Sequence, residues 1–237
     1  MDKRIKLFTV LSSIFLSALI LAEVTGGKLI QLTLSEEWIF TMTMGVIPFP
    51  ITFIITDIIN EYFGRKGMRY ITFLGMAMVV MVLVLLQVDM IVPAAAISPV
   101  SDEAFIGVFG ISVRIIIGSI IAYILGQLID ISIFHFIRER TGGRLLWLRA
   151  TGSTLISQLI DSFVVLLIAF SGQLSFGTIM EIGVTNYIYK FAIAILITPA
   201  LYLMHNIIDR YLGKELAEEM MEQAHREGTI ILKEQVQ

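Results

Sequence analysis

The stretch that decides the fold spans residues 49–67 and reads FPITFIITDIINEYFGRKG. It begins as an apolar segment of membrane character, yet Asp57, Asn60 and Glu61 recur at spacings of three and four residues, which places them along one face of a helix. A carboxylate that faces lipid is costly, so this face predicts an interior of protein or water that supplies a proton or a cation as partner. Arg65, one turn further on, is the nearest candidate.

Prolines and a glycine mark the two ends of this segment. Pro48 and Pro50 each remove a backbone donor, and such interruptions are tolerated within a membrane only where they face protein or a cavity. Gly64, followed by Arg65 and Lys66, is typical of a helix that ends at the cytoplasmic surface. The stretch is therefore expected to contain a membrane helix that stops at Gly64.

The composition of the whole chain excludes a soluble domain. Of the 237 residues, 57% are hydrophobic, against about 45–50% in soluble domains. The net charge is −3, and the sequence has no basic stripe of the kind that nucleic acid binding requires. The chain has no cysteine, which excludes disulfides, thiol catalysis and cysteine metal sites. A polytopic membrane protein is the class that remains.

Six segments are long enough to cross a bilayer, at about 17–25 residues each. Basic residues gather before the first segment, in every second loop and after the sixth, whereas the alternate loops carry acids, so the positive-inside rule places both termini in the cytoplasm. We therefore predict an all-α integral membrane protein, a bundle of six transmembrane helices, with a transmembrane domain over 1–212 and a cytoplasmic tail over 213–237. The spans are expected near 5–22, 38–59, 69–88, 108–135, 151–170 and 182–205.

Polar and ionisable residues recur inside three further spans. They are Arg114, Gln127 and Asp130 in the fourth span, Ser157, Gln158 and Asp161 in the fifth, and Asn186 and Lys190 in the sixth. Asp161 and Lys190 lie almost symmetrically about the loop that joins the last two spans, so an antiparallel hairpin with a rise of about 1.5 Å per residue brings them to similar depth. They form the natural charge pair, because an unpaired ion at that depth is costly.

These polar residues leave several classes of protein open. They could be structural ion pairs and interhelical hydrogen bonds that fix the register of the helices. Four helices that each direct several polar groups inward favour a polar substrate pathway instead.

An intramembrane enzyme is the rival class of protein. The sequence has no HExxH, no GxSxG and no cofactor fingerprint, so no cofactor or metal is expected. His135 and His205, near the inner ends of spans, are expected to be interfacial rather than catalytic. Nothing resembles the carbonyl filter of a channel, and a carrier is favoured.

Four segments, each on a different helix, together resemble a known family. They are residues 49–67, RIIIGSIIAYILGQLIDISIFHFIRER at 114–140, STLISQLIDSFVVLLIAF at 153–170, and NYIYKFAIAILITPALY at 186–202. They are similar to the queuosine precursor transporter family, also called the VUT family. The resemblance implies a multi-pass protein of the cell inner membrane, similar in architecture to the substrate-binding components of vitamin uptake systems. It also implies import of a 7-deazaguanine such as preQ0, preQ1 or queuine, from which queuosine is made in tRNA.

The chemistry of the polar residues fits a purine-like substrate. A guanine-like edge offers adjacent N–H donors that a carboxylate accepts in pairs, and acceptors to which amides, hydroxyls or a lysine donate. A substrate-capture subunit of an energy-coupling vitamin transporter is the alternative, and because the chain has no P-loop any use of ATP needs a partner. A homo-oligomer is also left open. The residues expected to bind substrate are Asp57, Asn60, Glu61, Arg114, Gln127, Asp130, Ser157, Gln158, Asp161, Asn186 and Lys190.

The tail beyond residue 213 is polar and carries Leu216, Met220 and Met221 at helical spacing. This pattern indicates a short amphipathic helix on the membrane surface or against the bundle, while an ordinary solvated tail fits equally well.

Overall fold

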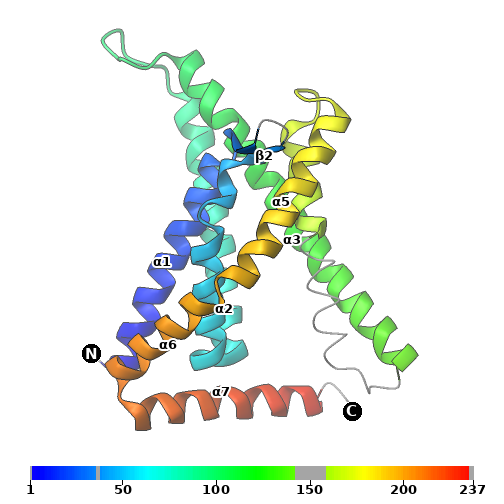
Figure 1. Cartoon of the computed structure of the whole chain (residues 1–237). Coiled ribbons are helices and arrows are strands. Elements are labelled where there is room, and N and C mark those ends of the chain that lie inside the picture. Colours follow the sequence, from blue (N-terminus) through cyan, green and yellow to red (C-terminus); the bar gives the residue numbers. More distant parts are fainter. Residues whose placement is uncertain (1, 36–37, 142–158, 235–237) are drawn as a thin grey trace. The chain divides into compact units, whose positions relative to one another are not determined.

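The computed structural model describes residues 2–35, 38–141 and 159–234 (Figure 1). The side chains of 34–35, 38, 126–141, 194, 225 and 227–234 lie outside this description. Along the chain the elements are α1 (Lys3–Thr25), β1 (Leu29–Ser35), β2 (Trp38–Thr43), a 3-10 turn (Met44–Val46), α2 (Phe49–Ile91), α3 (Asp102–Thr141), the unlabelled helix Leu159–Phe170, α5 (Phe176–Leu196), α6 (Thr198–Leu212) and α7 (Lys214–Glu234).

The described residues are mostly helical, which agrees with the predicted helical membrane class. The stretches Lys3–Thr25, Met44–Ile91 and Asp102–Leu125 are each long and apolar enough to cross a membrane. A fourth is added if α5 and α6, which meet at a bend, count as one span. The protein is therefore a multi-pass membrane protein.

The helix α2 is interrupted at Gly64. At about 1.5 Å per residue, 43 continuous residues would extend roughly 65 Å, twice the thickness of the hydrocarbon layer. Gly64 instead has φ 63° and ψ −167°, outside the helical region. We call residues 49–63 the first limb and 65–91 the second limb. Ile71 of the second limb is fully buried in one cluster with Ile58 and Ile59 of the first limb, so the two limbs pack on each other. Helix termination at Gly64, as the sequence predicted, is confirmed.

A β-hairpin precedes α2, and it corrects the predicted start of the second span. Residues 38–43, which were expected to be helical, form β2, which pairs antiparallel with β1 from Leu29↔Thr43 to Leu32↔Phe40. The helix begins only at Phe49. Pro48 disfavours helical backbone in the residue before it, and Pro50 fits only in a first turn, where its missing N–H has no helical partner to lose. The two prolines thus prevent the helix from reaching back to Trp38.

The chain forms two compact units. Unit 1 comprises Met1–Ala22, Ile47–Val82 and Lys190–Gln237, and unit 2 comprises Glu23–Val46 and Leu83–Tyr189. The core of unit 1 takes buried residues from α1, both limbs of α2, α6 and α7. The core of unit 2 joins α3 to the helix Leu159–Phe170 and to α5. At Gly118 of α3 a Cβ would lie 3.1 Å from the backbone of Val165, so the two helices approach closely because glycine has no side chain there.

The C-terminal residues 214–234 form the helix α7, which packs against unit 1 (Figure 1). Gly213, with φ 90°, ends α6 and allows the chain to turn. Met220 and Ala217 are buried in the core of unit 1, while Leu216 and Met221 pack against it. The amphipathic helix indicated by the sequence is therefore present, and it lies against the bundle.

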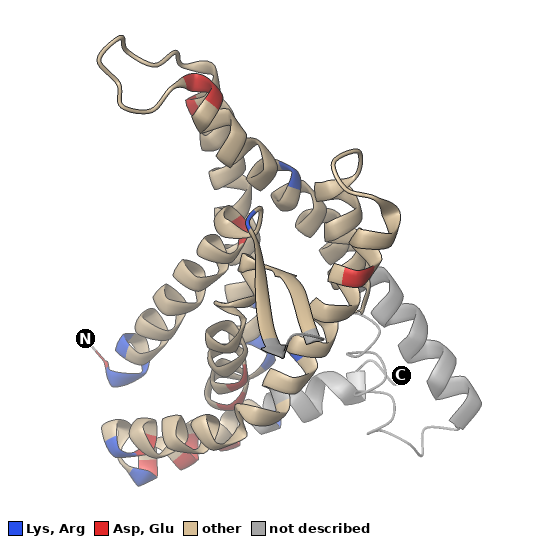
Figure 2. Cartoon of the chain, turned by 45° about the horizontal axis from the view of Figure 1, so that its top comes forward, with Lys and Arg blue, Asp and Glu red and all other residues tan. Residues whose placement is uncertain are grey.

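Basic residues at the start of α1 contact distant parts of the chain at one end of unit 1. Lys3 donates hydrogen bonds to the carbonyls of Tyr211 (2.9 Å) and Leu212 (3.2 Å), where cations are favoured by the end of α6. Arg4 pairs with Glu219 of α7 at 2.7 Å. Figure 2 shows these charges at the start of α1 and along α7, beside largely uncharged helix bodies. The N-terminus of α1 and the beginning of α7 thus lie at the same end of unit 1.

Replacement of Gly64 by alanine is expected to destabilise the protein. The backbone at Gly64 lies in a region that is essentially restricted to glycine, and an added Cβ would lie 3.1 Å from the Cα of Ala224 in α7. We expect Gly64→Ala to cost about 1–3 kcal/mol, visible as a lower Tm of the purified protein in detergent. Gly107→Ala is the matched control, because that helical position has open space around it and alanine is the better helix former. Equal Tm values for the two variants would contradict the assigned break.

Candidate functional site

A pocket of about 700 Å³ lies within unit 1, between the first limb of α2, α6 and α7. Each helix contributes residues from a single face, because 57, 60 and 61 recur at helical spacing on α2, and 198, 201, 202, 205 and 209 do so on α6. The pocket is lined by Asp57, Asn60, Glu61, Thr198, Leu201, Tyr202, His205, Asp209 and Met221. Its lining therefore combines carboxylates, an amide, an imidazole and a phenol with a few apolar side chains.

A continuous chain of polar contacts crosses from α2 to α6 beside this pocket. Glu61 Oε2 lies 2.9 Å from His205 Nε2. The other ring nitrogen, His205 Nδ1, lies 3.1 Å from the hydroxyl of Tyr62, and that hydroxyl donates to Asp209 Oδ1 at 2.7 Å. The four groups therefore alternate between the two helices and tie them together.

The surroundings of Tyr62 and His205 hold this chain of contacts in place. Tyr62 is 2% exposed within the core of unit 1, and its ring stacks on His205 with the centroids 5.5 Å apart. Glu61 is more open, with 42% of its side chain exposed against 22% for His205. The middle of the chain of contacts, at Tyr62, is therefore buried, whereas its two ends, Glu61 and Asp209, line the pocket.

The structure places three of the predicted site residues together. Asp57, Asn60 and Glu61 share one face and line the same pocket, as their spacing indicated. The partner expected for them was Arg65, but Glu61 contacts His205 instead, and Arg65 lies exposed beyond the break at Gly64. Because φ at Gly64 is positive, the helical geometry that would have placed Arg65 one turn above Glu61 ends before it reaches Arg65.

Two predicted site residues make hydrogen bonds that support the backbone of unit 2. Arg114 donates to the carbonyls of Ile168 (3.0 Å) and Ser171 (2.7 Å), which lie at the C-terminal end of the helix Leu159–Phe170. Asn186 is 5% exposed; it accepts from the backbone N–H of Thr43 and donates to the hydroxyl of Thr43, both at 3.2 Å. Asn186 thereby holds the end of β2 against α5.

The other predicted residues are not assembled into one site by the described structure. Lys190, in unit 1, lies 5.5 Å from the centroid of the Phe49 ring. Asp161 is partly buried and belongs to unit 2, whereas Lys190 belongs to unit 1. The pairing of these two side chains stays a prediction. The side chains of Gln127 and Asp130, and the residues Ser157 and Gln158, lie outside the described residues.

Sequence reasoning missed three members of the chain of contacts: Tyr62, His205 and Asp209. A signal was present, because Tyr202, His205 and Asp209 recur at spacings of three and four on one face, at the same end of their span as Asp57 and Glu61 on theirs. His205 was expected to be interfacial. That expectation stays a prediction, and the structure places His205 beside the carboxylate of Glu61.

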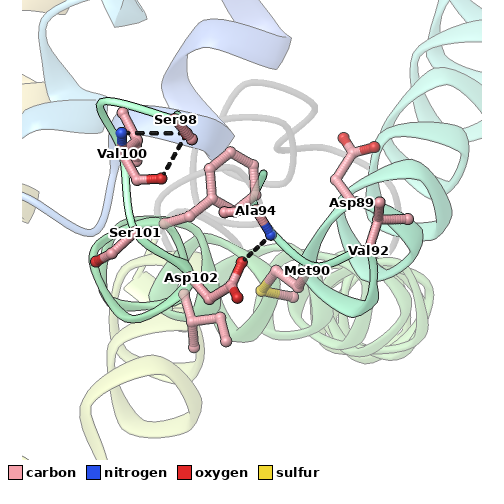
Figure 3. Close-up of a pocket in the computed structure, with 10 residues that line it drawn as sticks. Asp89, Met90, Val92, Ala94, Ser98, Val100, Ser101 and Asp102 are labelled. Atoms are coloured by element: carbon pink, nitrogen blue, oxygen red, sulfur yellow. Dashed lines mark hydrogen bonds between the residues drawn. The ribbon is translucent and has the colours of Figure 1, made fainter. Parts of the chain in front are cut away.

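A second, smaller hollow of about 320 Å³ lies in unit 2, where the end of α2 meets the start of α3 (Figure 3). Asp102 Oδ1 accepts a hydrogen bond from the backbone N–H of Ala94 at 2.8 Å and so holds the loop across the start of α3. The hydroxyl of Ser98 bonds with Val100 in the same loop. None of the described residues predicted to bind substrate lines this hollow. Within the described part of the chain, no three His, Asp or Glu side chains are placed to hold a metal ion.

These features define a multi-pass helical membrane protein with a polar pocket beside a Glu–His contact between two helices. Comparison with known proteins identifies the family. Residues 43–204 match the family model of putative vitamin uptake transporters, and the chain belongs to that family. No solved structure matches the chain.

Curated relatives support the same family. The chain is 31% identical over 169 residues to a probable queuosine precursor transporter of Bacillus subtilis (strain 168), with 71% of this chain and 73% of the relative covered. It is 30% identical over 209 residues to the queuosine precursor transporter of Escherichia coli (strain K12), with 82% and 84% covered. A probable queuosine precursor transporter of Haemophilus influenzae (strain ATCC 51907 / DSM 11121 / KW20 / Rd) is 27% identical over 201 residues, with 81% and 80% covered.

Proposed function

We propose that this protein is a carrier that imports a queuosine precursor, a 7-deazaguanine, and that the pocket of unit 1 is part of its substrate path. The observation that carries the proposal is the convergence of Asp57, Asn60 and Glu61 on one pocket, in a chain that belongs to a transporter family. The relatives named as queuosine precursor transporters supply the substrate class.

The size and lining of the pocket suit a flat nitrogen heterocycle. Small-molecule sites commonly have about 300–1,000 Å³ and combine apolar walls with a few placed polar groups. Asp57 and Asn60 are exposed in the pocket, so their polar atoms are available to a ligand. A carboxylate accepts the paired N–H donors of a guanine-like edge, and an amide both donates and accepts. Tyr202, which is 69% exposed, offers a ring for stacking.

We propose a six-span topology, which the break in α2 supports. The proposed crossings are α1, the first limb of α2, the second limb of α2, α3, the predicted span over 151–170, and α5 with α6. Basic residues at the start of α1 lie beside the junction of α6 and α7, at one end of unit 1, and the Gly64 turn, where Arg65 and Lys66 follow, lies against Ala224 of α7. The positive-inside rule then makes this end cytoplasmic, together with both termini. Met221 of α7 lines the pocket, and we propose that the pocket lies near the cytoplasmic surface.

The remaining predicted residues are proposed as further parts of the path. Gln127, Asp130, Ser157, Gln158, Asp161 and Lys190 would extend it through the other spans. Arg114 and Asn186 are proposed to act indirectly, because their described hydrogen bonds go largely to backbone groups, where they hold a helix end and the β-hairpin.

The proposal is tested by restoring queuosine to tRNA in a host that can neither synthesise nor import the precursor. Expression of this protein with external preQ0 is expected to restore the modification. Glu61→Gln, which removes a charge from the pocket, is expected to reduce uptake at limiting preQ0 at least tenfold, because a lost hydrogen bond to a charged group costs about 1.5–3 kcal/mol. Uptake of labelled preQ0 and the queuosine content of tRNA are the measurements.

Glu222→Gln is the matched control for Glu61→Gln. Glu222 is an exposed residue of α7 whose partner is Arg226 one turn away, so its removal changes a surface ion pair only. Wild-type uptake is expected for Glu222→Gln in equally expressed protein. The proposed site is wrong if Glu61→Gln also restores tRNA modification at the wild-type dose of preQ0, and the proposed function is wrong if the unaltered protein fails to restore it.

The topology is tested by single cysteines in this cysteine-free chain. Ile97, which is 94% exposed in the loop between α2 and α3, is proposed to face outward, whereas Lys214 at the start of α7 is proposed to face the cytoplasm. In intact cells a membrane-impermeant maleimide is expected to label Ile97→Cys and not Lys214→Cys, and both after permeabilisation. Labelling of both cysteines, or of Lys214→Cys alone, in intact cells would contradict the topology.

A further inference from the structure

The contacts among Glu61, His205, Tyr62 and Asp209 need more hydrogens than these groups carry in their usual ionisation states. Three contacts link the four groups, at 2.9, 3.1 and 2.7 Å. Each is a hydrogen bond only if one hydrogen lies between its two heavy atoms. With both carboxylates ionised and the imidazole neutral, the ring supplies one hydrogen and the phenol supplies one, which makes two.

The missing hydrogen belongs between Glu61 and His205. The single hydrogen of the Tyr62 hydroxyl is donated to Asp209 Oδ1, so the contact at 3.1 Å requires that His205 Nδ1–H donates to the Tyr62 oxygen. A neutral ring in that tautomer presents a lone pair at Nε2. Glu61 Oε2 lies 2.9 Å from that nitrogen, and two lone pairs at this distance repel. One additional proton, on Nε2 or on the carboxylate, converts the repulsion into a hydrogen bond, which is charge-assisted when the proton is on Nε2.

We propose that Glu61 and His205 form a proton-binding site that couples substrate import to the movement of a proton. The site binds one proton between Oε2 and Nε2, so the four groups together carry a charge of −1 with the proton and −2 without it. Loss of the proton breaks the Glu61–His205 bond, and the bonds of this set that remain between α2 and α6 are His205–Tyr62 and Tyr62–Asp209. The inference rests on the proposed transport function and deepens it.

Carboxylates predominate among the described ionisable groups around His205. Asp57, Glu61 and Tyr62 of the first limb and Tyr202 and Asp209 of α6 are the charged or titratable residues of the pocket and of the chain of contacts, and α7 contributes apolar Met221 to the pocket lining. Three of these groups are carboxylates, and among the described residues no lysine or arginine lines the pocket. An imidazole can hold a hydrogen on each ring nitrogen, and a carboxylate beside it accepts that hydrogen.

Substrate and proton meet at the same carboxylate. Glu61 contacts His205 through Oε2 while its side chain remains 42% exposed to the pocket. A substrate that donates N–H groups to Glu61 therefore interacts differently with the protonated and the deprotonated pair. Differential binding of this kind is what links two ligands thermodynamically.

The test uses the full chain in proteoliposomes with labelled preQ0, a neutral 7-deazaguanine, as the probe. Two quantities are measured: counterflow exchange without any gradient, and the plateau ratio of internal to external preQ0 under an inward proton gradient. For one proton per substrate, the plateau ratio is expected to rise about tenfold per unit of pH difference and to fall to one when a protonophore is added. The plateau is a thermodynamic quantity, so a slow variant is still informative.

Tyr62→Phe and His205→Gln are the informative variants, with Tyr70→Phe as the control. Tyr62 does not line the pocket, but removal of its hydroxyl frees His205 Nδ1, and the neutral ring can then donate from Nε2 to Glu61 without an additional proton. His205→Gln keeps a hydrogen-bonding side chain that does not titrate. Tyr62→Phe is expected to keep counterflow exchange of preQ0, and both variants are expected to reach a plateau ratio near one despite the gradient. Tyr70→Phe removes an exposed hydroxyl and is expected to accumulate preQ0 as the wild type does.

The outcomes separate coupling from transport. Absence of counterflow in the wild type would refute the proposed function and this inference with it. Counterflow with a wild-type plateau ratio of one under the gradient would refute proton coupling alone and leave the carrier in place. Gradient-driven accumulation that persists in both Tyr62→Phe and His205→Gln would refute the assignment of the proton to this pair.

Discussion

An ionisable side chain within a membrane helix must find a partner, and in unit 1 this constraint joins α2 to α6. Ile58 and Ile59, which lie near Glu61 on the same helix, are fully buried. The carboxyl group of Glu61 therefore lies beside a tightly packed apolar core. His205 provides the partner, and Tyr62 and Asp209 complete the set of contacts. Because buried polar groups are costly unless each is paired, these four residues fix how the two helices face each other. The pocket lies beside them, and Glu61 and Asp209, the first and last members of this set of contacts, line it.

The backbone departs from helical geometry at glycines and where a side chain supplies a hydrogen-bond partner. The chain turns at Gly64, which meets Ala224 of α7, and at Gly213, which separates α6 from α7. In unit 2 the β-hairpin ends at Thr43, whose backbone N–H donates to the buried amide of Asn186. Backbone that leaves the helical form within a membrane needs such partners, because lipid offers none. These turns and the β-hairpin, rather than the long apolar helices, distinguish this chain from a bundle of uninterrupted helices.

Much of the fold and part of the site could be predicted from the sequence. Long apolar stretches and the glycine at position 64 indicated the helices and the break in α2, because span length and backbone freedom are local properties. The strand at 38–43 was missed, because a run of aromatic and β-branched residues next to an apolar helix satisfies the length criterion for a span as well as the strand pattern. The shared face of Asp57, Asn60 and Glu61 followed from helical spacing alone. His205 as the partner of Glu61 did not, since 144 residues separate them and only the packing of α6 on α2 brings them together.

The central claim is that substrate occupies the pocket beside Glu61, and protection of a cysteine tests it most directly. With Asn60→Cys in the otherwise cysteine-free chain, the rate of maleimide labelling in purified protein is measured with and without saturating preQ0. Ile97→Cys, far along the chain in an exposed loop, serves as the reference. The account predicts that preQ0 slows labelling at position 60 several-fold and leaves position 97 unchanged. Equal labelling of Asn60→Cys with and without preQ0, in protein that demonstrably binds it, would contradict the account.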